Sequence, residues 1–144
     1  MAEELLRESF SVSARNFEKA GEVSSNIKAI LKELGIDSAI VRRAVIVSFE
    51  AEMNVVMYTT CGGCITFILT DRDITLEIVD GGPGIPDIRL AMQEGWSTAS
   101  DEMREMGFGF GMGLPNIKKN SDEFSIESEA GRGTRVFSRI QHSR

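Results

Sequence analysis

Two polar residues four positions apart, Glu50 and Asn54, interrupt an otherwise apolar stretch of the chain. If this stretch is helical they share one face, because residues four apart are neighbours on a helix surface. The amide oxygen of Asn54 is a suitable ligand for Mg²⁺, a hard cation that also takes phosphate oxygens. The Glu50 carboxylate could orient or deprotonate an attacking hydroxyl or water. The alternative is that both residues lie on a solvated face together with Glu52, and their spacing leaves that alternative open.

A first glycine-rich segment, residues 80–84 (Asp-Gly-Gly-Pro-Gly), follows an apolar run. Glycine is used where the backbone must approach a ligand closely or adopt a positive φ. A carboxylate at Asp80 can accept a hydrogen bond from an amino group such as that of adenine. The alternative is an ordinary turn aspartate, since Asp-Gly is a common turn signal.

A second glycine-rich segment, residues 107–113, ends where a helix is expected to begin. Backbone N–H groups at a helix N-terminus bind phosphate through their free donors. No Gly-Lys-Ser/Thr follows, so the segment is not a P-loop, and it lacks the strand context of a Rossmann fingerprint. A flexible surface loop is the alternative, although Phe108, Phe110 and Met112 between the glycines need somewhere to pack.

Cys61 and Cys64 are the two cysteines of the chain and form a Cys-Gly-Gly-Cys sequence. In a cytosolic chain this spacing suggests redox or metal chemistry before it suggests a structural disulfide. A zinc or iron–sulfur site usually needs four ligands, and the only histidine, His142, lies in the polar tail. A complete metal site would therefore need a second subunit or ligands of another type. Two reduced thiols in a turn, and a redox or dimer-bridging pair, both remain open.

The elements that must position these residues follow from hydrophobic periodicity. Residues 5–12 are expected to form a strand, and apolar residues at spacings of three and four predict a helix over residues 17–34. A second helix is expected to be capped by Asp37 or Ser38 and to run to Tyr58. Its centre also fits the period of a strand, but its length and its good helix formers favour helix.

Strands dominate the remainder of the chain. Two β-branched runs, residues 65–70 and 74–80, predict a hairpin. A short helix from Pro86 through Met92, a loop over residues 95–106, a helix opened by residues 113–115 and a closing hairpin of residues 123–128 and 134–140 are expected to follow. This order predicts one α+β layered domain spanning residues 1–144.

Composition excludes several classes of protein. The 144 residues carry a formal net charge of −6, and the basic residues are scattered, which argues against a nucleic-acid binder. No apolar run approaches the ~20 residues that span a bilayer. The first residues are acidic and lack the order of a signal peptide, so a cytoplasmic location without membrane attachment is expected.

Four motifs in fixed order are far more specific than any one of them. Residues 50–54, 80–84, 107–113 and 131–134 together resemble the conserved boxes of the histidine-kinase-like ATPase superfamily, which has the Bergerat fold. The resemblance covers about residues 12–140. It implies a two-layer α/β sandwich whose mixed, mostly antiparallel sheet is covered by helices on one face.

Within that superfamily the chain resembles the small bacterial branch of anti-sigma factors and switch-protein serine kinases. Four segments are similar to the stressosome-type serine kinase: residues 80–92, 95–98, 113–115 and 122–124. The charged stretch between Thr98 and Gly107 is instead more similar to that of an anti-sigma factor that is also a kinase.

The resemblance implies roles at the matched positions. Glu50 would be the catalytic base that activates a partner's serine hydroxyl, and Asn54 would ligate Mg²⁺. Arg104 corresponds loosely to an arginine that contacts the transferred phosphate. The remaining matched residues would surround ATP, with Asp80, Gly82 and Gly84 at the adenine, Thr134 near it through water, and Gly107, Gly109, Gly111 and Gly113 along the phosphates.

These roles imply an ATP- and Mg²⁺-dependent serine/threonine protein kinase that phosphorylates a STAS-type antagonist protein in partner switching. The alternatives are an anti-sigma factor that sequesters a sigma factor under nucleotide control and, because of the two cysteines, an ATP-binding accessory module of a redox system. The expected partners are the STAS protein and also a sigma factor or a phosphatase, with the protein itself a monomer or homodimer.

Overall fold

The computed structural model describes residues 3–85, 87–95 and 113–142. Its strands are β1 (Glu4–Val12), β2 (Gly63–Thr70), β3 (Asp73–Asp80), β4 (Glu123–Glu129) and β5 (Gly133–Gln141). Its helices are α1 (Glu22–Glu33), α2 (Ser38–Tyr58), α3 (Ile88–Ala91) and α5 (Gly113–Lys119).

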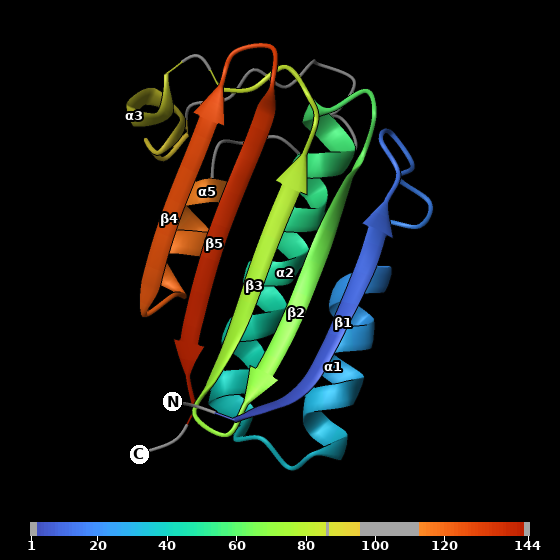
Figure 1. Ribbon diagram of the computed structural model, residues 1–144, viewed down its shortest axis with the longest axis vertical. Coiled ribbons are helices and arrows are strands. Elements are labelled where there is room, and N and C mark those ends of the chain that lie inside the picture. The colour runs from blue at the N-terminus through green and yellow to red at the C-terminus, as the bar shows by residue number, and fades with distance from the viewer. Residues whose placement is uncertain (1–2, 86, 96–112, 143–144) are drawn as a thin grey trace.

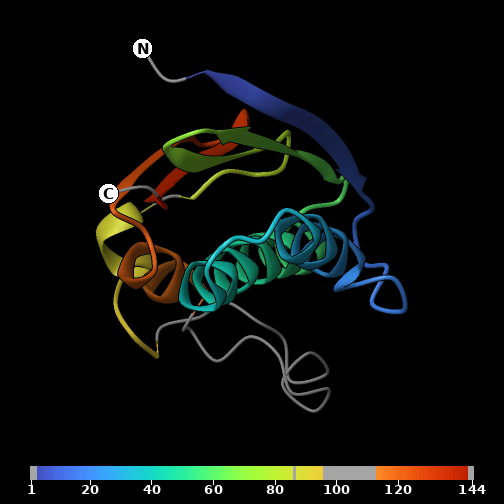
Figure 2. The same cartoon turned by 90° about the horizontal axis from the view of Figure 1, so that it is seen from below.

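The strands form one sheet in the order β1-β2-β3-β5-β4, and every pairing between them is antiparallel. Helices α1, α2 and α5 lie against one face of this sheet, and no helix of the described residues covers its other face (Figures 1 and 2). The predicted α+β, two-layer architecture is therefore confirmed. Both expected hairpins, β2–β3 and β4–β5, are also present.

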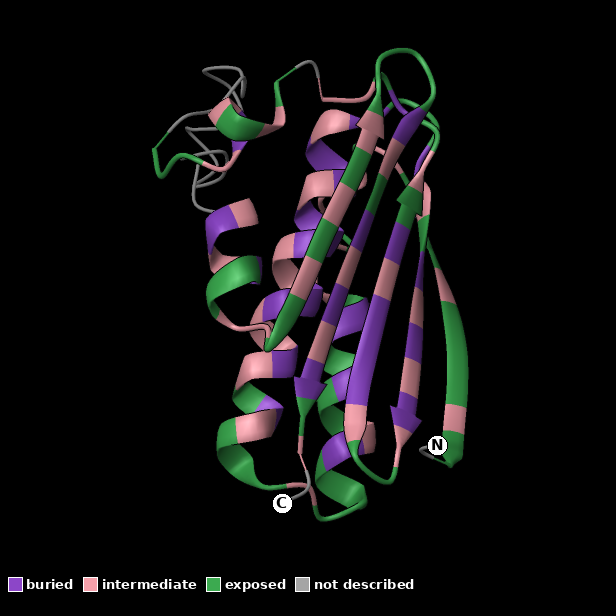
Figure 3. Cartoon of the chain, turned by 60° about the vertical axis from the view of Figure 1, so that its left-hand side comes forward, coloured by how far each residue is buried: buried purple, intermediate pink, exposed green. Residues whose placement is uncertain are grey.

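The core lies between the two layers. Alternate residues of β2 and β3 point inward, among them Ile65, Phe67, Leu76 and Ile78, and all are buried. An antiparallel sheet with one covered face produces this alternation. Figure 3 shows the same alternation of exposure along β4 and β5.

Helix α2 is the central helix and spans 21 residues. It begins at Ser38 because the Asp37 side chain accepts a hydrogen bond from the Ala39 N–H at 3.2 Å, which satisfies a free donor of the first turn. The prediction of a helix from there to Tyr58 is confirmed. Glu52, which the alternative interpretation assigned to a solvated face, is only 3% exposed.

Helix α1 begins at Glu22, so the prediction of a helix from residue 17 is wrong for residues 17–21. Gly21, directly before it, has φ +99°. This left-handed conformation prevents the helix from starting earlier in the chain. Phe17 and Ala20 still contact the apolar pair Met53 and Met57 of α2. The apolar spacing before Gly21 therefore reflects packing of a turn rather than a helix.

The short helix is also shorter than expected, because α3 covers only Ile88–Ala91. Asp87 caps it by accepting a hydrogen bond from the Leu90 N–H at 3.1 Å. Pro86, and all but the first residue of the loop expected over residues 95–106, lie outside the described residues. Among the residues that are described, no helix has the length and apolar character needed to cross a bilayer.

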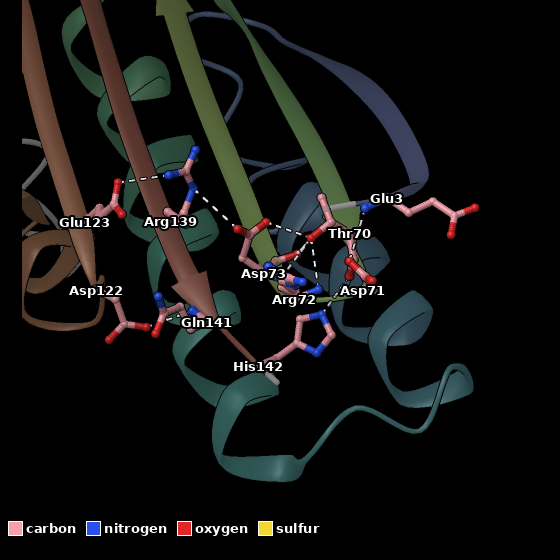
Figure 4. A network of polar contacts seen from close by, with 10 residues as sticks. All are labelled: Glu3, Thr70, Asp71, Arg72, Asp73, Asp122, Glu123, Arg139, Gln141 and His142. Atoms are coloured by element: carbon pink, nitrogen blue, oxygen red, sulfur yellow. Dashed lines mark hydrogen bonds and ion pairs between the residues drawn. The ribbon is translucent and has the colours of Figure 1, made fainter. Parts of the chain in front are cut away.

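Polar contacts hold the end of the sheet where β5 finishes (Figure 4). Asp122 accepts a hydrogen bond from the Gln141 N–H at 2.7 Å and pairs with Arg43 of α2 at 3.0 Å. These contacts lower the pKa of the Asp122 carboxyl below its ordinary value, the Gln141 bond being the largest cause. At the same end, Arg139 pairs with Glu123 at 3.0 Å.

We expect Asp122→Asn to lower the free energy of unfolding at pH 7 by about 1 kcal/mol, since hydrogen bonds to a charged acceptor are stronger and the pair is partly solvated. A carboxyl whose pKa is lowered by folding stabilises above its ordinary pKa and loses that effect as pH falls through the folded value. The difference between the proteins should therefore diminish as pH falls below about 3.9, the ordinary pKa of an aspartate. Urea unfolding at pH 7 and in this acid range measures it, with Glu127→Gln, an exposed acid of β4, as control. A difference that persists at low pH would contradict this explanation.

Candidate functional site

The predicted site residues begin at Asp80, the last residue of β3. Asp80 pairs with Gly63 of β2 on one side and with Thr134 of β5 on the other. Its carboxyl accepts a hydrogen bond from the Gly82 N–H at 2.9 Å. Burial raises the pKa of Asp80 above its ordinary value, and backbone hydrogen bonds from Gly82 and Thr134 oppose this in part. The structure thus holds a half-buried carboxylate at the end of the sheet.

Gly82 lies in a narrow space between Asp80 and the end of α2. A Cβ at this position would stand 3.0 Å from both the Asp80 Oδ1 and the Thr59 Cγ2 atoms. Thr59 is buried and is itself held, because its hydroxyl donates to the Val55 carbonyl at 2.7 Å and accepts from the Gly62 N–H at 3.1 Å. A side chain at this position would press on both the Asp80 carboxyl and Thr59, so one of them would have to shift. Thr59 was not predicted as a site residue, and no motif marks it.

Gly84 holds the same loop against the turn between β4 and β5. It has φ +79°, and a Cβ would stand 2.4 Å from the Glu129 carbonyl oxygen. The Gly131 N–H donates to the Pro83 carbonyl at 2.9 Å from the other side. Two of the predicted motifs, residues 80–84 and 131–134, are therefore in direct contact.

Ser128 joins Thr134 to this loop. The Ser128 hydroxyl accepts a hydrogen bond from the Ile85 N–H at 2.6 Å and lies 2.9 Å from the Thr134 Oγ1. The Ser128 side chain thus links Thr134 to the loop that follows Asp80. Ser128 was missed by sequence reasoning, because a serine at the end of an expected strand is unremarkable.

The second group of site residues meets where α5 begins. A Cβ on Gly113 would stand 3.0 Å from the Asn54 Oδ1 and 3.3 Å from the Glu50 Oε2. The last glycine of the second glycine-rich segment therefore lies directly against the polar pair of α2. The pair does not lie on a freely solvated face, as the alternative interpretation required, since both residues are only partly exposed.

Glu50 is electrostatically distinct from an ordinary surface glutamate. Burial raises the pKa of Glu50, and a hydrogen bond with the Asn116 side chain of α5 opposes this in part. Asn116 follows Gly113 by three residues, so the same short helix supplies both contacts. Sequence reasoning predicted this helix but gave no signal for Asn116.

Both groups lie along α2. Thr59, beside the Asp80 loop, follows Asn54 by five residues and Glu50 by nine, which corresponds to about 7 Å and about 14 Å along a helix axis. The carboxylate of Asp80 and the polar pair would thus be separate ends of one elongated candidate site. Arg104, Gly107, Gly109 and Gly111 were predicted to belong to it and lie outside the described residues.

The polar pair fits a metal only in a limited way. The described residues contain no group of three or more histidine, cysteine or acidic side chains able to hold a metal ion. Mg²⁺, however, commonly binds through one or two protein oxygens together with phosphate oxygens of a substrate. The Asn54 amide oxygen beside Gly113, where a Cβ would fill the space, suits that type of site.

A known protein family matches the larger part of the chain. Residues 39–144 match the family of histidine kinase-, DNA gyrase B-, and HSP90-like ATPases. The chain belongs to this family. All four predicted motifs fall within the matched residues, whereas β1 and α1 precede them.

Individual relatives refine this assignment. The chain is 37% identical to the serine/threonine-protein kinase RsbT of Bacillus subtilis (strain 168) over 110 residues, which is 74% of this chain and 77% of that protein. It is 33% identical to the anti-sigma F factor of Clostridium acetobutylicum over 61% of each chain. The anti-sigma F factor of Caldanaerobacter subterraneus is 41% identical over 49% of this chain and 45% of its own.

These matches confirm the predicted superfamily and its branch of small serine kinases and anti-sigma factors. The expected enzyme class, a serine/threonine protein kinase, is confirmed as the class of the relative that covers 74% of this chain. Membership of this ATPase family implies that ATP is the nucleotide that the chain uses.

We expect Gly84→Ala to destabilise the protein more than Gly131→Ala. Both glycines have φ +79°, but a Cβ at Gly131 meets nothing within 4 Å, whereas one at Gly84 meets the Glu129 carbonyl at 2.4 Å. The backbone penalty alone is about 1 kcal/mol for Gly131→Ala, and overpacking should bring Gly84→Ala to about 3 kcal/mol. Chemical denaturation of both variants measures this, and equal losses would show that the loop is not docked as described.

Proposed function

We propose that this protein is an ATP- and Mg²⁺-dependent serine/threonine protein kinase that phosphorylates a STAS-domain antagonist protein in a cytoplasmic partner-switching system. The observation that carries the proposal is the contact of Gly113, the end of the second glycine-rich segment, with Glu50 and Asn54. A glycine at this point keeps side-chain atoms away from the carboxylate and the amide, beside which a phosphate group and a reacting hydroxyl would lie. The similarity to a serine/threonine-protein kinase over most of the chain supports the same activity.

The adenine end of the site is formed by the Asp80 loop. The Asp80 carboxyl would accept a hydrogen bond from the adenine amino group. Gly82 and Gly84 have no side chains that would obstruct the loop. Thr134 lies beside the loop, because it is the residue of β5 that pairs with Asp80. The Gly82 N–H bond holds the carboxyl in a fixed orientation before ATP binds.

The phosphate end is formed by α2 and the segment that leads into α5. Asn54 would ligate Mg²⁺, which when bound neutralises phosphate charge and orients the transferred group. Gly107, Gly109, Gly111 and Gly113 would follow the phosphates with their backbone. By the family resemblance, Arg104 would contact the phosphate that is transferred.

Glu50 would act as the general base. The serine hydroxyl oxygen attacks the γ-phosphorus, the bond to the β-phosphate oxygen breaks to release ADP, and the hydroxyl proton passes to the Glu50 carboxylate. A base works best when its pKa is close to the operating pH, and burial moves the pKa of Glu50 in that direction. Asn116 keeps the carboxylate oriented towards the site.

The direct test is incubation of the protein with Mg·ATP and STAS-domain proteins encoded beside it, followed by mass spectrometry for phosphoserine and phosphothreonine. Phosphate on such a partner supports the proposal. Binding of Mg·ATP without transfer to any of these partners would overturn the kinase assignment.

A second function, nucleotide-controlled binding of a sigma factor, is favoured by the anti-sigma F factors among the relatives. The two functions are compatible, since one protein can hold a sigma factor and phosphorylate its antagonist. Co-purification of a sigma factor that changes between ADP and ATP supports this role. Capture of the STAS partner alone under both nucleotides argues against it.

We expect Glu50→Gln to reduce phosphoryl transfer by at least about 100-fold, because a general base is lost. ATP affinity should stay unchanged, because the substitution keeps the shape and the contact with Asn116. Wild-type transfer should fall as pH is lowered through the raised pKa of Glu50, and the variant should lack this dependence. Single-turnover assays over a pH series measure both, with Glu33→Gln on exposed α1 as control. Near-normal transfer by Glu50→Gln would remove this residue from its role.

We expect Asn54→Ala to weaken ATP binding in the presence of Mg²⁺ by at least about tenfold, the loss typical of even an indirect metal-site partner. Without Mg²⁺, in EDTA, wild type and variant should bind ATP equally. Calorimetric titration with and without the metal measures this, and Asn26→Ala on the exposed side of α1 serves as control. A loss that is the same in EDTA would mean that Asn54 does not act through the metal.

A further inference from the structure

Cys61 lies in the connection between α2 and β2, and Cys64 is the second residue of β2. This connection lies at the end of the sheet where β3 finishes (Figure 1). Both are free cysteines and both are exposed. The nucleotide site as proposed above uses neither of them. Cys61 nevertheless lies against Gly81, the residue that follows Asp80.

Both cysteines lie beside the end of β3. Cys64 is paired with Val79 across β2 and β3, and Val79 is 48% exposed on the uncovered face. The Cys61 Sγ is 3.4 Å from the position that a Cβ on Gly81 would occupy. Gly81 directly follows Asp80, the last residue of β3. The two cysteines are therefore next to positions that are two residues apart in the chain.

The glycines between the cysteines hold this connection in place. A Cβ on Gly62 would stand 2.4 Å from the Val12 carbonyl oxygen, and one on Gly63 would stand 2.7 Å from the Val79 carbonyl oxygen. Gly62 also has φ +77°, which favours glycine. The backbone between the cysteines is thus packed tightly between β1 and β3, while the thiols on either side of it remain exposed.

The same connection contacts the Asp80 loop at two points. Cys61 lies against Gly81 directly, and the Gly62 N–H donates to the Thr59 hydroxyl at 3.1 Å. Thr59 in turn packs against Gly82, whose N–H holds the Asp80 carboxyl. A movement of Cys61 would therefore reach the Asp80 loop by two routes: directly through Gly81, and through Thr59 and Gly82.

We propose that Cys61 and Cys64 form a reversible intramolecular disulfide that weakens nucleotide binding at the adjacent Asp80 loop. The oxidant is a low-molecular-weight disulfide. One cysteine thiolate attacks it and releases one small thiol, and the second cysteine then attacks the mixed disulfide and releases another. Two electrons pass from the cysteines to the oxidant, and the two thiol protons end on the released thiols. The regulatory part of this proposal rests on the proposed ATP site.

The expected direction follows from geometry. A disulfide requires the two Cβ atoms to approach to about 3.8 Å. Closing it draws Cys61 towards Cys64 along the connection, away from its contact with Gly81, and strains the Gly62 bond to Thr59. The side of the Asp80 loop that faces α2 then loses its support, so the carboxyl is less well oriented for a nucleotide.

The test compares reduced protein with protein oxidised by glutathione disulfide. Intact mass and thiol alkylation show whether both thiols are lost within one chain, and non-reducing electrophoresis shows whether chains are linked. Titration with Mg·ATP should give an affinity at least about fivefold weaker after oxidation, the lower end of typical coupling between sites. Reduction should restore it. Cys61→Ser and Cys64→Ser should bind ATP as the reduced wild type does, with or without oxidant.

The possible results separate the two proposals. A disulfide that leaves ATP affinity unchanged overturns the regulation, and mixed disulfides or linked chains in place of an intramolecular disulfide overturn the pairing. Loss of affinity on oxidation that persists in both serine variants also overturns it, because the effect then arises elsewhere. Failure of the reduced protein to bind Mg·ATP overturns the proposed function together with its regulation, whatever the thiols do.

Discussion

Helix α2 lies with its apolar side against the middle of the sheet, and this burial orients every group around the candidate site. Val47, Ala51 and Val55 are almost completely buried against the inward residues of β2 and β3. A helix held along one side cannot rotate about its axis without exposing these residues, which costs about 25 cal/mol for each Å² of apolar surface. Glu50 and Asn54 are thereby held towards α5, and the end of the helix at Thr59 is held towards the Asp80 loop.

The same helix also places two acidic side chains in different surroundings. Glu50 faces Gly113 and Asn116, whereas Glu52, two residues later, is buried and accepts a hydrogen bond from the Val23 N–H at 3.4 Å at the beginning of α1. Burial raises the pKa of Glu52, although the backbone N–H groups of Gly21, Val23 and Ser24 oppose this. A carboxylate at a helix N-terminus satisfies free donors and favours the helix dipole. Glu52 thus joins α1 to α2, whereas Glu50 faces the candidate site.

The two ends of the sheet have different character. At the end where β3 finishes, glycines replace side chains, and the Asp80 loop, the β4–β5 turn and the cysteine connection touch through backbone atoms. At the opposite end, charged side chains such as Asp122 and Arg139 fasten β5 to its neighbours (Figure 4). Glycine permits the close backbone approach at the first end, whereas ion pairs join the strands at the second. Asp122 therefore belongs to the framework at the end of the sheet opposite the candidate site.

Local patterns were sufficient to predict the type and order of the elements, because hydrophobic periodicity and capping residues act over a few positions of the chain. The start of α1 was misplaced because Phe17 and Ala20 keep a helical spacing but pack as a turn before Gly21. The motifs likewise indicated Asp80, Gly82 and Gly113. Strand register and the packing of α2 and α5 decide which residues lie beside them, namely Thr59, Ser128 and Asn116. The same packing decides that Glu52 is buried. Those contacts join residues far apart in the chain, and no local spacing specifies them.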